Sequence, residues 1–153
     1  MSQTGAGSAF QEFSQRLIQE FWNFYPTAGS RIGRHEYDGR LPDLSPVSLR
    51  RRVDQLGQGM AFLEAAGSGG GNAEDWLSLQ LLKLFLKREH FSLTDLRPLE
   101  NNPMRQVGYL NVAGYLQRDY APMADRLQAA TRVLQQVPEF LDTLTTALGE
   151  AIG

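Results

Sequence analysis

Apolar residues recur at helical spacing in the first part of the chain. They follow one another at steps of three or four residues and share one helix face: Phe10, Phe13, Leu17, Phe21 and Phe24. Pro26 cannot continue a helix, and it disfavours helical geometry at the residue before it. We therefore predict a helix over residues 8–25 with its aromatic face buried. The small and polar residues 1–7 are predicted to be disordered.

A segment without regular structure, residues 27–44, is predicted to follow this helix. Its residues that disfavour both helix and strand are Gly29, Gly33, Gly39 and Pro42. A second helix then begins, since Ser45 is a suitable N-cap and Pro46 fits the first helical position. Its apolar positions alternate steps of four and three residues, as in antiparallel bundles: Leu49, Val53, Leu56, Met60 and Leu63.

Further helices are predicted in the second half of the chain, over about residues 73–90, 104–120, 122–137 and 138–152. Pro122 and Pro138 each open one of them, because proline is favoured at the first helical position. The glycine-rich residues 67–71 are predicted to be a flexible linker. No stretch alternates with a period of two for long enough to indicate a sheet.

This pattern predicts an all-α fold of about six helices in an irregular, mostly antiparallel bundle. The length of 153 residues suits one compact domain, which we place at residues 8–153. The apolar positions of the last predicted helix continue to Ile152, next to the C-terminus. We expect from this that the domain is the N-terminal part of a longer protein.

The composition narrows the classes of partner and compartment. A formal net charge of -2 gives no reason to expect nucleic acid as a partner. Cysteine is absent, which excludes disulfides, thiolate nucleophiles and cysteine zinc ligands. The sequence contains neither a visible signal peptide nor an apolar run of about 20 residues. We therefore expect a cytoplasmic protein with no membrane and no nucleic-acid partner.

The segment His-Glu-Tyr-Asp at residues 35–38 contains residue types that can bind a metal. A zincin motif, His-Glu-x-x-His, would need a second histidine at position 39, but that residue is Gly39. The other histidine, His90, lies far along the chain. We therefore predict no catalytic residue, no metal site and no cofactor in this chain. A small hydrolase that uses His35 and nearby carboxylates is an alternative.

Two other patterns could indicate binding. Three consecutive arginines, residues 50–52, follow the start of the second helix. In an acidic chain without aromatic neighbours they favour a solvent-exposed helix face, paired with carboxylates, over a nucleic-acid site. The aromatic face of the first helix could line a ligand pocket, but helical spacing is more typical of a core.

Three stretches near the N-terminus resemble a known family. They read Phe-Trp-x-x-Tyr-Pro over residues 21–26, Gly-x-His-x-Tyr-Asp over 33–38 and Arg-Leu-Pro-Asp-Leu-Ser over 40–45. Looser matches follow at residues 102–103, 115–122, 126 and 137–138. Together these stretches are similar to the N-terminal region of the bacterial domain-of-unknown-function 885 family.

The resemblance implies a role as part of a larger enzyme. Full members of that family are several times longer, largely helical and similar to zincin-type metallopeptidases. Their His-Glu-x-x-His helix lies downstream of the matched region, and nothing in this sequence matches it. The implied function is a non-catalytic N-terminal helical domain that forms part of a substrate cleft or lid. Zinc would be held in the rest of a full-length protein, and the implied partners are that remaining polypeptide and a peptide substrate.

The loop at residues 31–46 contains the candidate binding residues. We expect it to face a cleft through His35, Tyr37, Asp38, Arg40 and Asp43. The resemblance assigns no catalytic role to these positions. The alternative is a structural loop, in which Asp38 and Asp43 accept hydrogen bonds from backbone amides and Tyr37 packs on a helix.

A different class of function is also open. The chain could be a stand-alone helical protein–protein interaction module that forms a homo-oligomer or binds another protein. Its aromatic first helix and its last helix would then bury their apolar faces in the partner.

Overall fold

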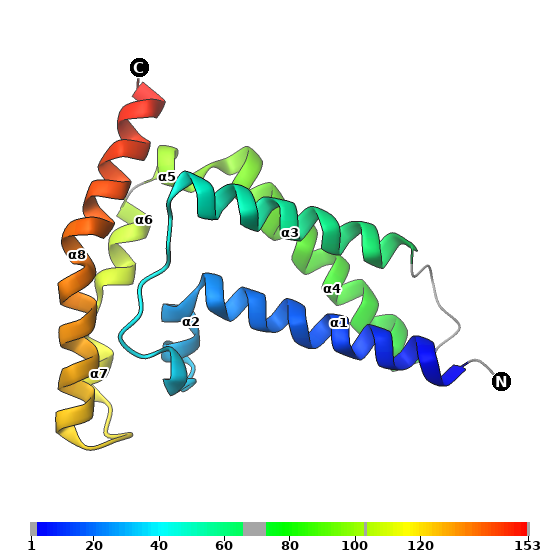
Figure 1. Cartoon of the computed structure of the whole chain (residues 1–153), viewed down its shortest axis with the longest axis horizontal. Coiled ribbons are helices and arrows are strands. Elements are labelled where there is room, and N and C mark those ends of the chain that lie inside the picture. The colour runs from blue at the N-terminus through cyan, green and yellow to red at the C-terminus, as the bar shows by residue number, and fades with distance from the viewer. Residues whose placement is uncertain (1–2, 66–72, 103, 153) are drawn as a thin grey trace. The chain divides into compact units, whose positions relative to one another are not determined.

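The computed structural model describes residues 3–65, 73–102 and 104–152, most of which are helical. No strand occurs in these ranges (Figure 1). The predicted all-α class with about six helices is therefore confirmed. None of the described helices combines the length and the apolar character needed to cross a bilayer. The linker predicted at residues 67–71 lies outside the described residues.

The described helices group into two compact units. Unit 1 contains Met1–Leu17 and Val47–Arg97, and unit 2 contains Ile18–Pro46 and Pro98–Gly153. Each unit thus combines two stretches that are distant in sequence. Because the units interleave along the chain, no change of composition marks a boundary between them.

Unit 1 is built from three long helices. The first part of α1 (Gln3–Phe24) packs with α3 (Pro46–Ala65) and α4 (Ala73–Phe91), which continues into the π-helical turn η2 (Ser92–Leu96). Its core is an apolar cluster from all three helices: Phe13, Leu17, Leu56, Leu63, Leu79 and Leu86.

The start of α1 differs from the prediction. The helix begins at Gln3, five residues before the start that the apolar spacing predicted. Extending an existing helix fixes one residue for each new hydrogen bond, which costs less than starting a helix. The long aromatic helix that follows therefore supports the weakly helical residues at its start.

A buried ion pair lies inside unit 1. Arg52 is 1% exposed, and its Nε and Nη2 each donate a 3.0 Å hydrogen bond to the carboxylate of Glu89. The solvent-exposed face predicted for residues 50–52 is therefore wrong for Arg52. It lies four residues after Ser48 and four before Leu56, which are both buried, and this spacing puts it on the inner face of α3.

Unit 2 contains the longest of the described helices, α8 (Met123–Ile152), which is continuous through Pro138 (Figure 1). The break predicted at this proline is therefore wrong. Val133 before it and Phe140 after it are both buried on the same helix face. Burial of this face offsets the hydrogen bond that proline removes from the helix.

Short helical segments occupy the region predicted as one helix over residues 104–120. The segments of unit 2 between η2 and α8 are α5 (Pro98–Asn101), α6 (Met104–Val107), η3 (Gly108–Leu110) and α7 (Ala113–Gln117). The break before α7 lies at Asn111, whose side-chain oxygen accepts a 2.9 Å hydrogen bond from the backbone N–H of Ala113. Such a local bond competes with the helical pattern and starts a new helix. Helix α7 then packs against α8.

Candidate functional site

The segment after α1 was predicted to lack regular structure over residues 27–44, and this is wrong for two short helical segments that a tight turn joins. Helix α2 (Pro26–Arg31) is followed by Gly33, whose φ of 93° lies in the left-handed region that glycine adopts without strain. The backbone N–H groups of Gly33 and Arg34 both donate back to carbonyls of α2, as in a Schellman motif. This turn leads directly into η1 (His35–Tyr37) and so sets the position of His35.

Tyr37 is a core residue of unit 2, with 2% of its surface exposed. Its ring lies against Gly29, where a Cβ atom would be 2.9 Å from the ring atom Cδ2. Its hydroxyl accepts a 2.6 Å hydrogen bond from the side-chain amide of Gln19. The guanidinium of Arg40 lies 5.4 Å from the centroid of the same ring. Tyr37 and Arg40 therefore stabilise the loop.

The carboxylate of Asp38 joins three side chains. Its Oδ2 accepts a 2.7 Å hydrogen bond from the Tyr120 hydroxyl and lies 3.1 Å from Nδ1 of His35. Its Oδ1 accepts a hydrogen bond from the hydroxyl of Ser30. The Asp38 side chain is only 10% exposed, so these contacts replace most of its hydration.

His35 and Tyr120 form a stacked pair beside this carboxylate. Their ring centroids are 3.8 Å apart and their planes differ by 3°. Partial burial raises the pKa of the Tyr120 phenol, and the hydrogen bond to Asp38 together with its negative charge raises this pKa further. The phenol therefore remains protonated at neutral pH and keeps donating to Asp38.

A chain of hydroxyl groups continues from Asp38 to α7. The hydroxyls of Ser30 and Tyr115 are 3.3 Å apart, and the Tyr115 oxygen also accepts a 3.0 Å hydrogen bond from the backbone N–H of Gly39. The single Ser30 hydrogen is directed to Asp38, so the Tyr115 hydroxyl supplies the hydrogen between the two oxygens. Because each donor polarises the next, the chain strengthens the bond to the carboxylate.

Arg126 of α8 holds the turn between α7 and α8. Its buried side chain donates hydrogen bonds of 3.3, 2.6 and 2.8 Å to the backbone carbonyls of Tyr115, Arg118 and Ala121. Its Nη2 also donates a 2.9 Å bond to the carboxylate of Asp119. These bonds satisfy carbonyls at the end of α7 and fix the geometry of the whole turn.

The side chain of Gln136 ties the loop to α8. Its amide nitrogen donates a 2.8 Å hydrogen bond to the carbonyl of Gly39, and its amide oxygen accepts a 3.2 Å bond from the N–H of Leu41. Gly39 has a φ of 77°, and a Cβ atom there would lie 3.1 Å from the carbonyl oxygen of Ala129. A histidine at position 39, which a zincin motif would need, therefore does not fit against α8.

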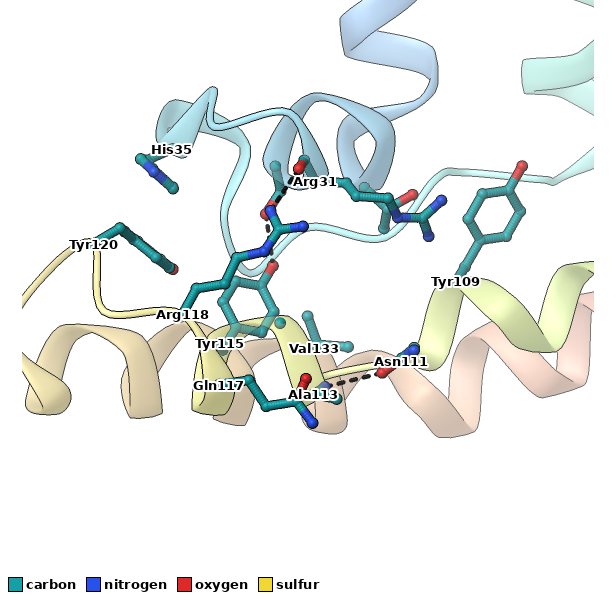
Figure 2. A pocket seen from close by; sticks show the side chains of 13 residues that line it. Arg31, His35, Tyr109, Asn111, Ala113, Tyr115, Gln117, Arg118, Tyr120 and Val133 are labelled. Atoms are coloured by element: carbon teal, nitrogen blue, oxygen red, sulfur yellow. Dashed lines mark hydrogen bonds between the residues drawn. The ribbon is translucent and has the colours of Figure 1, made fainter.

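These contacts surround a pocket of about 250 Å³ in unit 2 (Figure 2). It lies between α2 and η1 on one side and α7 with the following turn on the other. Its main polar lining residues are Arg31, His35, Tyr109, Tyr115, Arg118 and Tyr120.

Two arginines give the pocket a positive charge. Arg118 reaches across it, and its Nη1 donates a 2.7 Å hydrogen bond to the backbone carbonyl of Arg31 (Figure 2). The side chain of Arg31 extends toward Tyr109. Burial raises the pKa of Tyr109, while the positive charges of Arg105 and Arg31 act in the opposite direction. The positive charge of Arg31 therefore favours the deprotonated form of the Tyr109 phenol, which lines the pocket.

The five predicted binding residues divide between the pocket, the core and a local turn. His35 lines the pocket, and Asp38 positions it from one side. Tyr37 is in the core, with Arg40 over its ring. Asp43 is exposed and accepts a 3.0 Å hydrogen bond from a backbone N–H two residues later, which is a local turn contact.

Sequence reasoning missed the second side of the pocket. Tyr115, Arg118 and Tyr120 belong to residues 115–122, for which the sequence analysis predicted the same resemblance as for the loop. The structure brings this stretch against the loop in unit 2. Because the same resemblance was predicted for both stretches, it could have been used to assign them to one candidate site.

No group of three or more histidine, cysteine, aspartate or glutamate side chains that could hold a metal ion occurs in the part of the chain that the structure describes. The two histidines belong to different units, His35 to unit 2 and His90 to unit 1.

Comparisons of the chain with protein-family models, with curated proteins and with solved structures gave no match. The resemblance to the domain-of-unknown-function 885 family therefore stays a prediction.

Proposed function

We propose that this chain is a non-catalytic helical domain of a zincin-like, cytoplasmic bacterial metallopeptidase, and that its unit 2 forms part of the substrate cleft. One observation carries this proposal. Gly39 and Tyr115 are 76 residues apart in sequence, yet they are hydrogen-bonded beside one pocket. The two stretches that contain them, residues 33–45 and 115–122, both contribute to the resemblance to that peptidase family.

The buried polar side chains beside the pocket are energetically unfavourable if their role is only structural. Removing the Asp38 carboxylate from water is unfavourable unless donors compensate for the lost hydration. Ser30 and Tyr120 supply such donors, but apolar side chains could pack the same elements without any compensation. A concave surface that retains a polar network of this kind is typical of a binding site.

In this proposal the domain binds and orients a peptide. The zinc ion, its ligands and the general base belong to another part of the longer protein, because Gly39 stands where the loop would need its second histidine. The pocket offers guanidinium, phenol and amide groups, which can hydrogen-bond to the carbonyls or the carboxylate of a peptide.

The gene that encodes this chain provides the first test. The reading frame around and after this sequence is searched for a helix that contains His-Glu-x-x-His. A frame that encodes such a helix supports the proposal, and a frame without one contradicts its peptidase part.

The second test uses the protein made from that whole frame. Hydrolysis of short peptides is measured before and after chelation of zinc, in the parent and in the variants Arg118→Gln and Arg50→Gln. We expect Arg118→Gln to raise KM several-fold with the zinc content unchanged, whereas Arg50→Gln, on an exposed part of α3, matches the parent. An unchanged KM in Arg118→Gln would place the pocket outside the cleft.

A second candidate function, self-association, is favoured by the two faces of α4. One face is buried in unit 1 through Leu79, Leu86 and Glu89. The opposite face carries exposed apolar side chains at steps of four, three and seven residues: Leu77, Leu81, Leu84 and Phe91. Such steps are those of a helix that pairs with another helix along a coiled-coil seam.

A second copy of this chain fits the exposed face of α4. In an isologous pair the same row of exposed leucines is present in both copies, so the two apolar faces can cover each other. Sedimentation would then detect a dimer that the double variant Leu81→Gln/Leu84→Gln converts to a monomer. The matched control Leu127→Gln/Leu134→Gln alters exposed leucines of α8. A parent chain that is monomeric at micromolar concentration rules out this candidate.

A further inference from the structure

The charges that line the pocket of unit 2 are unbalanced. Its charged lining side chains are Arg31 and Arg118, while the ring of His35 lies 3.1 Å from the Asp38 carboxylate and adds no unbalanced charge. Among the described residues, no aspartate or glutamate lines it. The carboxylate of Asp38 accepts hydrogen bonds from neighbouring hydroxyl groups and is not among the lining groups. Such a lining favours an anionic ligand.

Both arginines keep hydrogen-bond donors for a ligand. Arg118 uses Nη1 for the backbone carbonyl of Arg31, and this contact orients its guanidinium across the pocket (Figure 2). Within the described ranges, the guanidinium of Arg31 makes no hydrogen bond or ion pair. Guanidinium groups present their N–H donors in a planar fork, which matches the two oxygens of a carboxylate.

The size and the remaining lining of the pocket limit the ligand. A volume of about 250 Å³ is smaller than the roughly 300–1,000 Å³ of pockets that hold drug-sized molecules. Tyr109 and Val133 add aromatic and apolar surface, and Gln117 adds an amide. This combination suits one amino-acid residue, with its side chain on the apolar part and its charge on the arginines.

We infer that the pocket binds the carboxylate of a single amino-acid residue between Arg31 and Arg118, with the side chain of that residue against Tyr109. When the residue is the C-terminus of a peptide, the substrates of the proposed enzyme are short peptides with a free C-terminus. This second step rests on the proposed peptidase function, whereas carboxylate binding does not.

Binding is tested on the full 153-residue chain by NMR titration. The probe is N-acetyl-leucine, and the matched uncharged control is N-acetyl-leucinamide. We expect N-acetyl-leucine to shift the backbone signals of Tyr109 and Gly114, and the amide to bind at least about tenfold more weakly. Equal binding of the two compounds overturns the inference, as does the absence of binding at concentrations on the order of 10 mM.

Two arginine variants locate the site. Arg31→Gln and Arg118→Gln should each weaken the binding of N-acetyl-leucine about tenfold, because each removes a charged donor. The control Arg50→Gln removes the same charge from unit 1 and should bind like the parent. Circular dichroism verifies that each variant is folded. Undiminished binding in both pocket variants overturns the assignment of the site.

Two further probes identify the source of the anion. Inorganic phosphate that binds more tightly than N-acetyl-leucine overturns the carboxylate assignment. N-acetyl-glutamic acid α-amide carries only a side-chain carboxylate, and equal binding of this compound would support the carboxylate site but overturn the C-terminal assignment. Weaker binding of both probes supports the whole inference.

These results are separable from the test of the proposed function. If N-acetyl-leucine binds but the gene encodes no zinc-binding helix, the carboxylate site is supported and the proposed peptidase function is contradicted. If the whole protein is a zinc-dependent peptidase but this chain does not bind N-acetyl-leucine, the proposed function is supported and the carboxylate site is contradicted.

Discussion

The hydroxyl of Tyr120 donates a 2.7 Å hydrogen bond to the carboxylate of Asp38, which lies 82 residues earlier in the chain. This bond connects the loop after α2 to the turn between α7 and α8. It also holds the ring of Tyr120 in place for its stack on His35. The two sides of the pocket are therefore joined by a charge-assisted hydrogen bond.

Replacing this phenol should change how stability depends on pH. Partial burial and the Asp38 carboxylate raise the pKa of Tyr120 above its ordinary value of 10.0, so folding favours the protonated phenol. This contribution to stability is fully present below about pH 10 and is lost as the pH rises through the folded-state pKa. We expect the free energy of unfolding to fall more steeply above this pH in the parent than in Tyr120→Phe.

Urea denaturation at a series of pH values from neutral to alkaline measures this difference. At neutral pH, Tyr120→Phe should be less stable by about 1 kcal/mol, because the Asp38 carboxylate loses one donor at a partly exposed position. Parallel stability curves for the two proteins above pH 10 would show that the phenol does not titrate as described.

Gly39 and Gly33 should respond very differently to the same substitution. Both have positive φ, and Gly33→Ala, which has open space around its Cβ, should cost about 1 kcal/mol of conformational strain. Gly39→Ala adds contacts of 3.1 Å with the carbonyl oxygen of Ala129 and with Cβ of Arg132, so it should cost about 2 kcal/mol more. Thermal unfolding of the two variants measures the difference. Equal losses would mean that α8 moves to accept the methyl group.

The buried pair of Arg52 and Glu89 should be more sensitive to the loss of one partner than of both. Arg52→Met leaves the carboxylate buried without its guanidinium and should destabilise unit 1 by about 3–5 kcal/mol. In the double variant Arg52→Met/Glu89→Met no buried charge remains, so most of this loss should be recovered. A double-mutant cycle by urea denaturation provides the measurement. Additive losses from the two single variants would argue against coupling between the two side chains.

Removing the guanidinium of Arg126 should loosen the turn that follows α7. Arg126→Met leaves three backbone carbonyls without their donor, which should destabilise unit 2 by at least about 3 kcal/mol. Amide hydrogen exchange should accelerate at Arg118 and Tyr120 before the rest of unit 2. The control is Arg50→Met, which removes an exposed arginine from α3. Uniform acceleration along the whole of α8 would contradict a local role.

Hydrophobic periodicity located the long helices but could not choose their neighbours. Leu127 and Leu134 of α8 continue the apolar spacing and are nevertheless 47% and 55% exposed, while Ala129 and Val133 on an adjacent face are buried. A helix with two apolar faces does not reveal which face will be covered. Arg52 shows the reverse case, because its partner Glu89 is 37 residues away and no local pattern predicts that a charge will be buried.

The candidate site could be predicted only where its residues are close in sequence. His35 and Asp38 are three residues apart, and their residue types alone suggested a polar site. Tyr115 contacts Ser30 across 85 residues, so its role depends on a packing of α7 that no local pattern predicts. The break at Asn111, which positions α7, was also missed because Asn occurs within helices as well as at their starts.

The alternation of the two units along the chain also sets an order of synthesis. Both stretches of unit 1 have been synthesised once residue 97 has been added. The hydrogen bonds of Asp38 and Gly39 to Tyr120 and Gln136 can form only after those later residues have been synthesised. Contacts between such distant residues form late, because a long loop must close first. On a ribosome, unit 1 can thus fold while the loop that builds the pocket still lacks its partners, and this loop is among the last parts of the protein to take its final form.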